Sequence, residues 1–132
     1  MSVIYKAKTQ EGFNIKVLIE LLQHNIKTAC FKIDKDGISL RMMDSHRRIL
    51  IDLNMLSDRF QVYKFNSEEN IFLGLNLNHF YKMLKSIKKK DSIILFIDPE
   101  HSNKLGITVI PKEKNRITNS YIKIQNIQNL DI

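Results

Sequence analysis

Residues 74–98 read GLNLNHFYKMLKSIKKKDSIILFID, and this stretch predicts a helix at 77–89 that leads directly into a strand. The apolar residues of its first half recur at i, i+3, i+4 and i+7, the spacing of one helical face: Phe80, Met83, Leu84 and Ile87. Lys82, Lys85 and Lys89 then point away from that apolar face, since successive helical residues are about 100° apart. The short apolar run at 92–98 predicts the strand.

Residues 12–34 read GFNIKVLIELLQHNIKTACFKID and repeat this design. The first helix is expected at 13–26, with Leu18, Leu21 and Leu22 facing inward. Its outward face is expected to carry Lys16, Glu20, Gln23 and Lys27. We therefore expect two internal repeats, at about 1–66 and 67–132, each built as strand, helix and three strands.

Alternating or apolar runs separated by turn residues predict the strands of both repeats. These strands are expected at 2–8, 29–34, 38–43, 47–54, 59–66, 70–76, 92–98, 105–111 and 117–127. Asp36-Gly37 lies between two of the runs and is typical of a tight hairpin turn. No linker divides the chain, so we expect a single α+β domain over 1–132, with one continuous antiparallel sheet and both helices on one face.

Composition narrows the class of protein. A chain of 132 residues is long enough to bury a core without disulfide bonds, and its single Cys30 is expected to be a buried structural thiol in a reducing, intracellular setting. No apolar run is long enough to cross a bilayer, and the N-terminus lacks the layout of a signal peptide. The net charge of +7 favours polyanionic partners, with nucleic acid ahead of a membrane surface.

No set of residues assembles catalytic chemistry. The four histidines are scattered, no Cys/His spacing forms a zinc site, and no glycine-rich loop precedes a helix. Asp34-Lys35-Asp36-Gly37 begins like a calcium loop but lacks the closing ligands, so a turn is the better interpretation. We expect no enzyme activity, no cofactor and no metal site.

The order of elements and a set of short motifs resemble the N-terminal domain of the proliferating cell nuclear antigen family, the sliding clamps of DNA replication. The motifs are spread through nearly the whole chain: Ala29-Cys30 after the first helix, Met43-Asp44-Ser45 before a turn, Gly74-Leu75-Asn76-Leu77, and Lys82-Met83-Leu84-Lys85. The resemblance implies a DNA-clamp domain that helps to encircle duplex DNA. It also implies a processivity factor that tethers DNA polymerase and other replication and repair proteins.

The resemblance assigns roles to three groups of residues. Sequence-independent contact with double-stranded DNA falls to Lys16, Lys82, Lys85 and Lys89. A groove for clamp-binding peptides of the polymerase and other partners falls to Met43, Arg47 and Leu50. A subunit interface on the last strand falls to Ile117, Tyr121 and Lys123. A clamp loader and a homotrimeric ring are implied for the full-length protein, in the nucleus or at a cytoplasmic replication site if the source is viral.

The chain also departs from the family pattern. It stops at 130–132, where the connector to a second domain would begin, so we expect a fragment of a longer clamp that is monomeric by itself, ahead of the alternative of a single-domain relative. Family members are typically acidic overall, whereas this chain is basic. Arg47-Arg48 replaces the usual polar-then-apolar pair and favours partners with acidic flanks.

Two alternatives to a replication clamp stay open. One is a clamp relative with a checkpoint or transcription role, which the sequence does not separate from a replication clamp. The other is a stand-alone basic module that holds nucleic acid on its sheet, and such a platform needs exposed aromatic rings. The phenylalanines lie mostly in core-like patterns, which disfavours that module: Phe31, Phe60, Phe72, Phe80 and Phe96.

Overall fold

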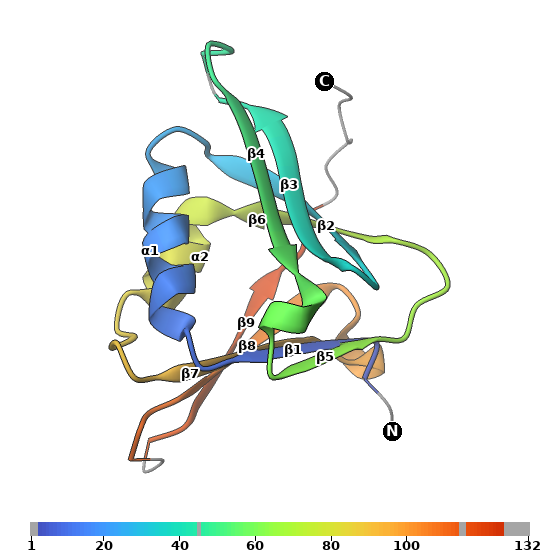
Figure 1. The fold of residues 1–132 in the computed structure, drawn as a ribbon, viewed down its shortest axis with the longest axis vertical. Coiled ribbons are helices and arrows are strands. Elements are labelled where there is room, and N and C mark those ends of the chain that lie inside the picture. The colour runs from blue at the N-terminus through green and yellow to red at the C-terminus, as the bar shows by residue number, and fades with distance from the viewer. Residues whose placement is uncertain (1–2, 45, 114–115, 126–132) are drawn as a thin grey trace.

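A computed structural model of the chain describes residues 3–44, 46–113 and 116–125. Two α-helices lie together against two antiparallel sheets, so the predicted α+β class is confirmed (Figure 1). In chain order the elements are β1 Tyr5–Thr9, α1 Gly12–Gln23, β2 Thr28–Asp34, β3 Gly37–Met43, β4 Leu50–Leu56, the 3-10 helix η1 Ser57–Arg59, β5 Val62–Phe65, β6 Ile71–Asn76, α2 Leu77–Leu84, β7 Ser92–Ile97, the 3-10 helix η2 Pro99–His101, β8 Lys104–Ile110 and β9 Thr118–Lys123.

The two halves of the chain exchange their opening strands. The five-stranded sheet has the order β5-β1-β7-β8-β9, so β1 of the first half pairs with β7 of the second. The four-stranded sheet has the order β4-β3-β2-β6, so β6 of the second half pairs with β2 of the first. The series β1-β7-β8-β9 is therefore the counterpart of β6-β2-β3-β4, and β4 and β9 lie at equivalent outer edges.

The expected single continuous sheet is wrong in detail, because the strands form two sheets. An isolated bridge connects them, in which the Gln125 N–H donates to the Gly74 carbonyl at 2.7 Å. Alternation along a strand tells which side chains face inward, but it does not specify which strand is the neighbour. The exchange of opening strands was accordingly not visible in the sequence.

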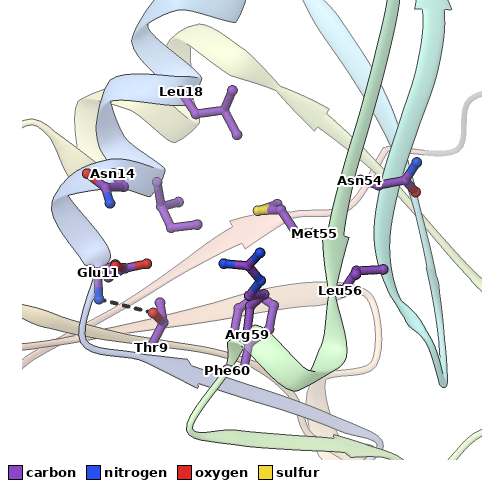
Figure 2. A pocket seen from close by; sticks show the side chains of 10 residues that line it. Thr9, Glu11, Asn14, Leu18, Asn54, Met55, Leu56, Arg59 and Phe60 are labelled. Atoms are coloured by element: carbon purple, nitrogen blue, oxygen red, sulfur yellow. Dashed lines mark hydrogen bonds between the residues drawn. The ribbon is translucent and has the colours of Figure 1, made fainter.

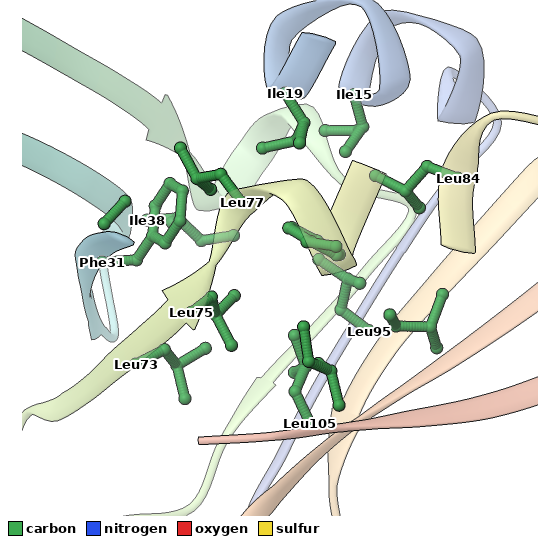
Figure 3. Packing of buried hydrophobic residues seen from close by; sticks show 14 of the residues in the cluster. Ile15, Ile19, Phe31, Ile38, Leu73, Leu75, Leu77, Leu84, Leu95 and Leu105 are labelled. Atoms are coloured by element: carbon green, nitrogen blue, oxygen red, sulfur yellow. The ribbon is translucent and has the colours of Figure 1, made fainter. Parts of the chain in front are cut away.

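The core lies between the helices and the inner faces of both sheets (Figure 3). The predicted inward face of α2 is confirmed at Phe80, Leu84 and Ile87, which are 3%, 0% and 2% exposed. On α1 the expectation was wrong for Leu21, which is 61% exposed. The buried stripe follows i, i+4, i+7 and i+11 instead: Ile15, Ile19, Leu22 and Ile26.

Two other expectations about burial fail. Phe72 on β6 is 45% exposed and Phe96 on β7 alternates with the buried Leu95 and Ile97, so both rings lie on outer sheet faces. Cys30 is half-buried, and desolvation raises the pKa of its thiol, which disfavours the reactive thiolate.

The second helix is shorter than predicted. It ends at Leu84, where the expectation was 89, and the Ile87 N–H bonds to the Leu84 carbonyl at 3.0 Å to close the last turn. The Asp91 carboxylate then accepts the Lys88 N–H at 2.9 Å and holds the chain in a new turn. Lys89 lies in that turn and not on the helix.

The hairpin predicted at Asp34 to Gly37 is confirmed. The Asp34 carboxylate accepts the Asp36 and Gly37 N–H groups at 2.8 and 3.1 Å, so it organises the turn. Gly37 has φ of +146°, which a side chain would not tolerate there.

Some expectations fall on residues outside the described ranges. These are residue 2 of the first predicted strand, Ser45 of the Met-Asp-Ser motif, residues 126 and 127 of the last predicted strand, and the connector start at 130–132.

Candidate nucleic-acid interface and partner sites

The two helices are tied together by two polar contacts on their exposed side. The Tyr81 hydroxyl of α2 donates to the Glu20 carboxylate of α1 at 2.6 Å, and this hydrogen bond raises the pKa of Tyr81. The Lys16 ammonium of α1 donates to the Ile87 carbonyl just beyond α2, at 3.2 Å. Both contacts cross between the repeats and fix the spacing of the helices.

Lys16 is therefore engaged within the protein. Its Nζ also lies 4.7 Å from the centroid of the Phe13 ring, a cation–π geometry, and the residue is half-buried. A lysine that donates to a carbonyl and covers an aromatic ring has to leave both contacts to reach a phosphate. We therefore place Lys16 in the helix–helix contact first and in any DNA contact second.

Lys82 and Lys85 are the two predicted lysines that remain exposed on α2. Lys82 lies in the last turn and Lys85 is the C-terminal cap, so both lie where the helix dipole favours a cation. Lys89 is separated from them by the turn after the helix. It lines a cavity of about 490 Å³ with Lys90 and Lys112. The four predicted residues thus form a pair on α2, one engaged lysine and one lysine on a separate loop.

The exposed side of α1 is less basic than the sequence pattern suggested. Val17 and Leu21 are 37% and 61% exposed and stand one turn apart. Positive charge on the helical face therefore comes mainly from α2. The sequence already predicted a mixed outward face on α1, with Glu20 and Gln23 on it, but it did not predict the exposed Leu21.

The predicted groove residues are partly brought together. Met43 and Leu50 are direct partners across β3 and β4 and lie on the outer face of the four-stranded sheet. Leu50 is 45% exposed, and the neighbouring Ile49 is 54% exposed and was not predicted. Arg47 lies in the connecting turn with φ of +57°, exposed to solvent.

Asp44 sets the geometry of that turn. Its carboxylate accepts the Arg48 and Ile49 N–H groups at 2.8 and 3.1 Å, and the residue is only 7% exposed. The hydrogen bond from Ile49 is the main cause that lowers the pKa of Asp44, against the opposing effect of desolvation. The Asp44 carboxylate therefore holds the turn in its charged form, and the turn exposes Arg47 and Ile49 to solvent.

The predicted interface residues lie at a free edge. β9 is the outermost strand of its sheet, and Ile117 and Tyr121 are 53% and 43% exposed. The Tyr121 ring packs edge-on against Phe96 with centroids 5.8 Å apart. Lys123 is exposed and stands opposite Lys104 of β8.

A cavity that the sequence did not indicate lies between α1 and the end of β4 (Figure 2). Its volume is about 340 Å³, and Glu11, Arg59 and Phe60 contribute to its wall. The Thr9 hydroxyl accepts the Glu11 N–H at 3.0 Å, so it is already occupied within the protein. The lining comes from residues 9–18 and 54–60, which only the folded chain brings together.

The described part of the chain contains no group of three or more His, Cys, Asp or Glu side chains that could hold a metal ion. None of its helices has the length and apolar character needed to cross a bilayer.

The fold defines the class of protein. Two solved clamps superimpose on it: PCNA from Thermococcus kodakaraensis, with a TM-score of 0.86 over 97% of this chain at 23% identity, and PCNA from Entamoeba histolytica, with a TM-score of 0.88 over 99% at 22% identity. This chain covers 49% and 51% of those two chains. At these identities the likeness concerns the fold, which is that of a DNA-clamp domain.

Sequence comparison identifies the family. The family model described as "Proliferating cell nuclear antigen, N-terminal domain" matches residues 4–131, and the chain belongs to that family. A protein named DNA polymerase sliding clamp from Thermococcus onnurineus is 38% identical over 84% of this chain and 43% of its own length. Proliferating cell nuclear antigen 2 from Plasmodium falciparum is 33% identical over 87% of this chain and 43% of its own length. The chain thus spans less than half the length of these curated relatives.

Proposed function

We propose that this chain acts as one clamp domain of a sliding clamp that encircles duplex DNA and works as a processivity factor. The observation that carries the proposal is the pair of exposed lysines on α2, Lys82 and Lys85, on the helical side of a clamp fold. Lysines that contact phosphates attract DNA of any sequence, because base edges are not read. A clamp needs such contacts, since base-specific hydrogen bonds would stop it on the duplex.

The lysines provide attraction and the ring provides retention. Lysine is a hydrated charge on a flexible stem, so it can exchange one phosphate for the next as the duplex moves. Two or three such contacts give only weak binding at physiological salt. Encirclement by three two-domain subunits then keeps the clamp on DNA, with β9 pairing through its backbone edge to the second domain of the next subunit. Catalysis is left to the tethered partners.

The turn at 44–49 is our candidate for partner docking. Leu50 and Met43 offer an apolar floor on the outer face, and Ile49 adds an exposed apolar side chain beside it. A short helical peptide of DNA polymerase, or of the clamp loader, can insert apolar anchors into such a surface. Arg47 and Arg48 then favour acidic residues beside those anchors. Such a clamp works in the nucleus, or at a cytoplasmic replication site if its source is viral.

Nuclear magnetic resonance of the labelled chain with a 20-base-pair duplex tests the proposal, at a length of about two helical turns. Amide shifts should change around Lys82 and Lys85 and leave β4 and the turn at 44–49 unperturbed. Two duplexes of unrelated sequence should give the same pattern. Shift changes confined to the outer sheet faces would contradict a helical DNA-binding surface.

A further inference from the structure

The outer face of the five-stranded sheet concentrates positive charge. Side chains alternate along each strand, so the residues that flank the buried ones point away from the helices. The lysines on this face come from four strands: Lys6, Lys8, Lys64, Lys104 and Lys123. Lys6 stands directly opposite Lys64, and Lys104 directly opposite Lys123.

Two like-charged pairs on one face cost stability, because directly opposed side chains are close neighbours. In the part of the chain that the structure describes, none of these lysines forms an ion pair. The ion pair found there joins His101 and Asp98, at 3.2 Å. Lysines on edge strands are a known guard against aggregation, which accounts for Lys64 and Lys123. It does not account for Lys6 and Lys104 on inner strands, whose charge an anionic partner would neutralise.

An aromatic shelf lies between the two lysine pairs. The Phe96 ring lies across Gly106 of the neighbouring strand, because a Cβ on Gly106 would overlap the ring atoms Cζ, Cε1 and Cε2 together. One ring face is thus directed at the glycine backbone and the other away from the sheet. Tyr121 stands at an interplanar angle of 78° beside it, and His101 lies 5.6 Å from Tyr121.

The Phe96 ring therefore lies flat on the sheet, the Tyr121 ring stands upright beside it, and lysines lie on both sides of the two rings. Lys6 is the direct neighbour of Phe96 on β1, and Tyr121 is the neighbour of Gly106 on β9. Adjacent strands are about 4.8 Å apart, so Lys64 lies about 10 Å from the Phe96 position and within reach of the next phosphate. A base stacked on a ring with phosphates at lysines is how sequence-tolerant proteins hold single strands.

We propose that this face, with Phe96 and Tyr121 at its centre, binds single-stranded nucleic acid. Bases stack on the Phe96 and Tyr121 rings, and phosphates lie against Lys6, Lys64 and Lys123. A duplex does not fit the shelf, because its bases are stacked inside the helix. The site is independent of the helical face, and strand pairing at β9 would use the backbone edge while the Tyr121 ring stands on the sheet face.

The probes are fluorescein-labelled oligo(dT) and oligo(rU) of about 12 nucleotides, within the range of site sizes of single-strand-binding domains. Anisotropy titrations across a salt series compare wild type with K64E/K123E and with the matched reversal K27E/K35E, whose lysines lie elsewhere on the exposed surface. The K64E/K123E variant should flatten the log–log salt slope by about 1.4, at 0.7 per lost contact. The K27E/K35E variant should leave the slope within error. Both oligonucleotides should behave alike, since neither stacking nor phosphate contact requires the 2′-hydroxyl.

Stacking needs its own variant. Phe96→Leu should weaken oligonucleotide binding roughly tenfold without changing the salt slope, because a ring is lost and no charge. Tyr121→Leu repeats this test if thermal melting shows that Phe96→Leu is poorly folded.

An unchanged slope in K64E/K123E, or unchanged affinity in a folded Phe96 or Tyr121 variant, would overturn the proposal. So would competition by poly-glutamate equal to that of oligo(dT), which indicates a surface for acidic protein. Duplex binding, governed by Lys82 and Lys85, is measured in parallel, so failure here leaves the clamp proposal standing.

Discussion

At the scale of single residues, two residues of the same type can lie in opposite environments. Leu84 is fully buried where α2 meets the core, whereas Leu21 of α1 is 61% exposed. The Lys16 ammonium contacts a backbone carbonyl and an aromatic ring, whereas Lys82 is exposed to solvent. Residue type therefore gives the chemistry that is available, and the contacts decide whether it is used.

The two leucines make a matched test of the packing. Leu84→Ala should lower the free energy of unfolding by about 2–5 kcal/mol, because it leaves a cavity beneath α2. Leu21→Ala should change it by less than about 0.5 kcal/mol, because its side chain is mostly solvated. Urea denaturation followed by circular dichroism measures both. Equal losses would show that α1 is rotated from the position described.

Asp44 should make stability depend on acid. Its pKa is lowered in the folded protein from an ordinary value of 3.8, chiefly by the hydrogen bond from Ile49. The carboxylate thus stabilises the fold above that ordinary value, and this stabilisation is lost as the pH falls through the lowered pKa. Asp44→Asn should be less stable than wild type near neutral pH, and the difference should shrink with acidification. A difference that is constant with pH would rule out a role for the charge.

At the scale of elements, the sequence predicted types better than ends and partners. Period-3.6 and alternating patterns placed both helices and all nine strands, because burial of one face imposes those periods. The end of α2 was predicted too late, because Ile87 continues the apolar spacing beyond the last helical residue. The chain there is already in a turn that the Asp91 carboxylate stabilises. The apolar Val17 and Leu21 on α1 were missed for a similar reason, because periodicity in a leucine-rich helix is compatible with more than one buried face.

The β3–β4 turn carries a prediction about partners. Leu50→Asp should abolish binding of a clamp-binding peptide from a DNA polymerase, because it places a charge on the apolar floor opposite Met43. The fold should be unaffected, since Leu50 is already 45% exposed. Calorimetry with wild type and with Asn54→Asp, which adds a charge to the same strand outside the floor, provides the comparison. Retained affinity in Leu50→Asp would remove the groove assignment.

At the scale of the whole molecule, the exchange of opening strands makes the two repeats one body. The five-stranded sheet takes β1 and β5 from the first half and the four-stranded sheet takes β6 from the second, so neither half would have a complete sheet alone. The design leaves β4 and β9 as free edges at equivalent positions, which suits addition of further domains. The family could be inferred from spaced motifs, whereas the outward Phe96 shelf could not, because its glycine partner lies on another strand.

We propose that the helical side of this body contacts duplex DNA through charge alone. A salt titration of binding tests it, with wild type, K82E/K85E and the control K32E/K35E on two duplexes of unrelated sequence. Loss of two phosphate contacts should flatten the log–log salt slope by about 1.8, at 0.9 per contact, equally for both duplexes, while the control keeps the wild-type slope. An unchanged slope in K82E/K85E, or a loss confined to one duplex, would contradict a charge-only contact of the helical side with DNA.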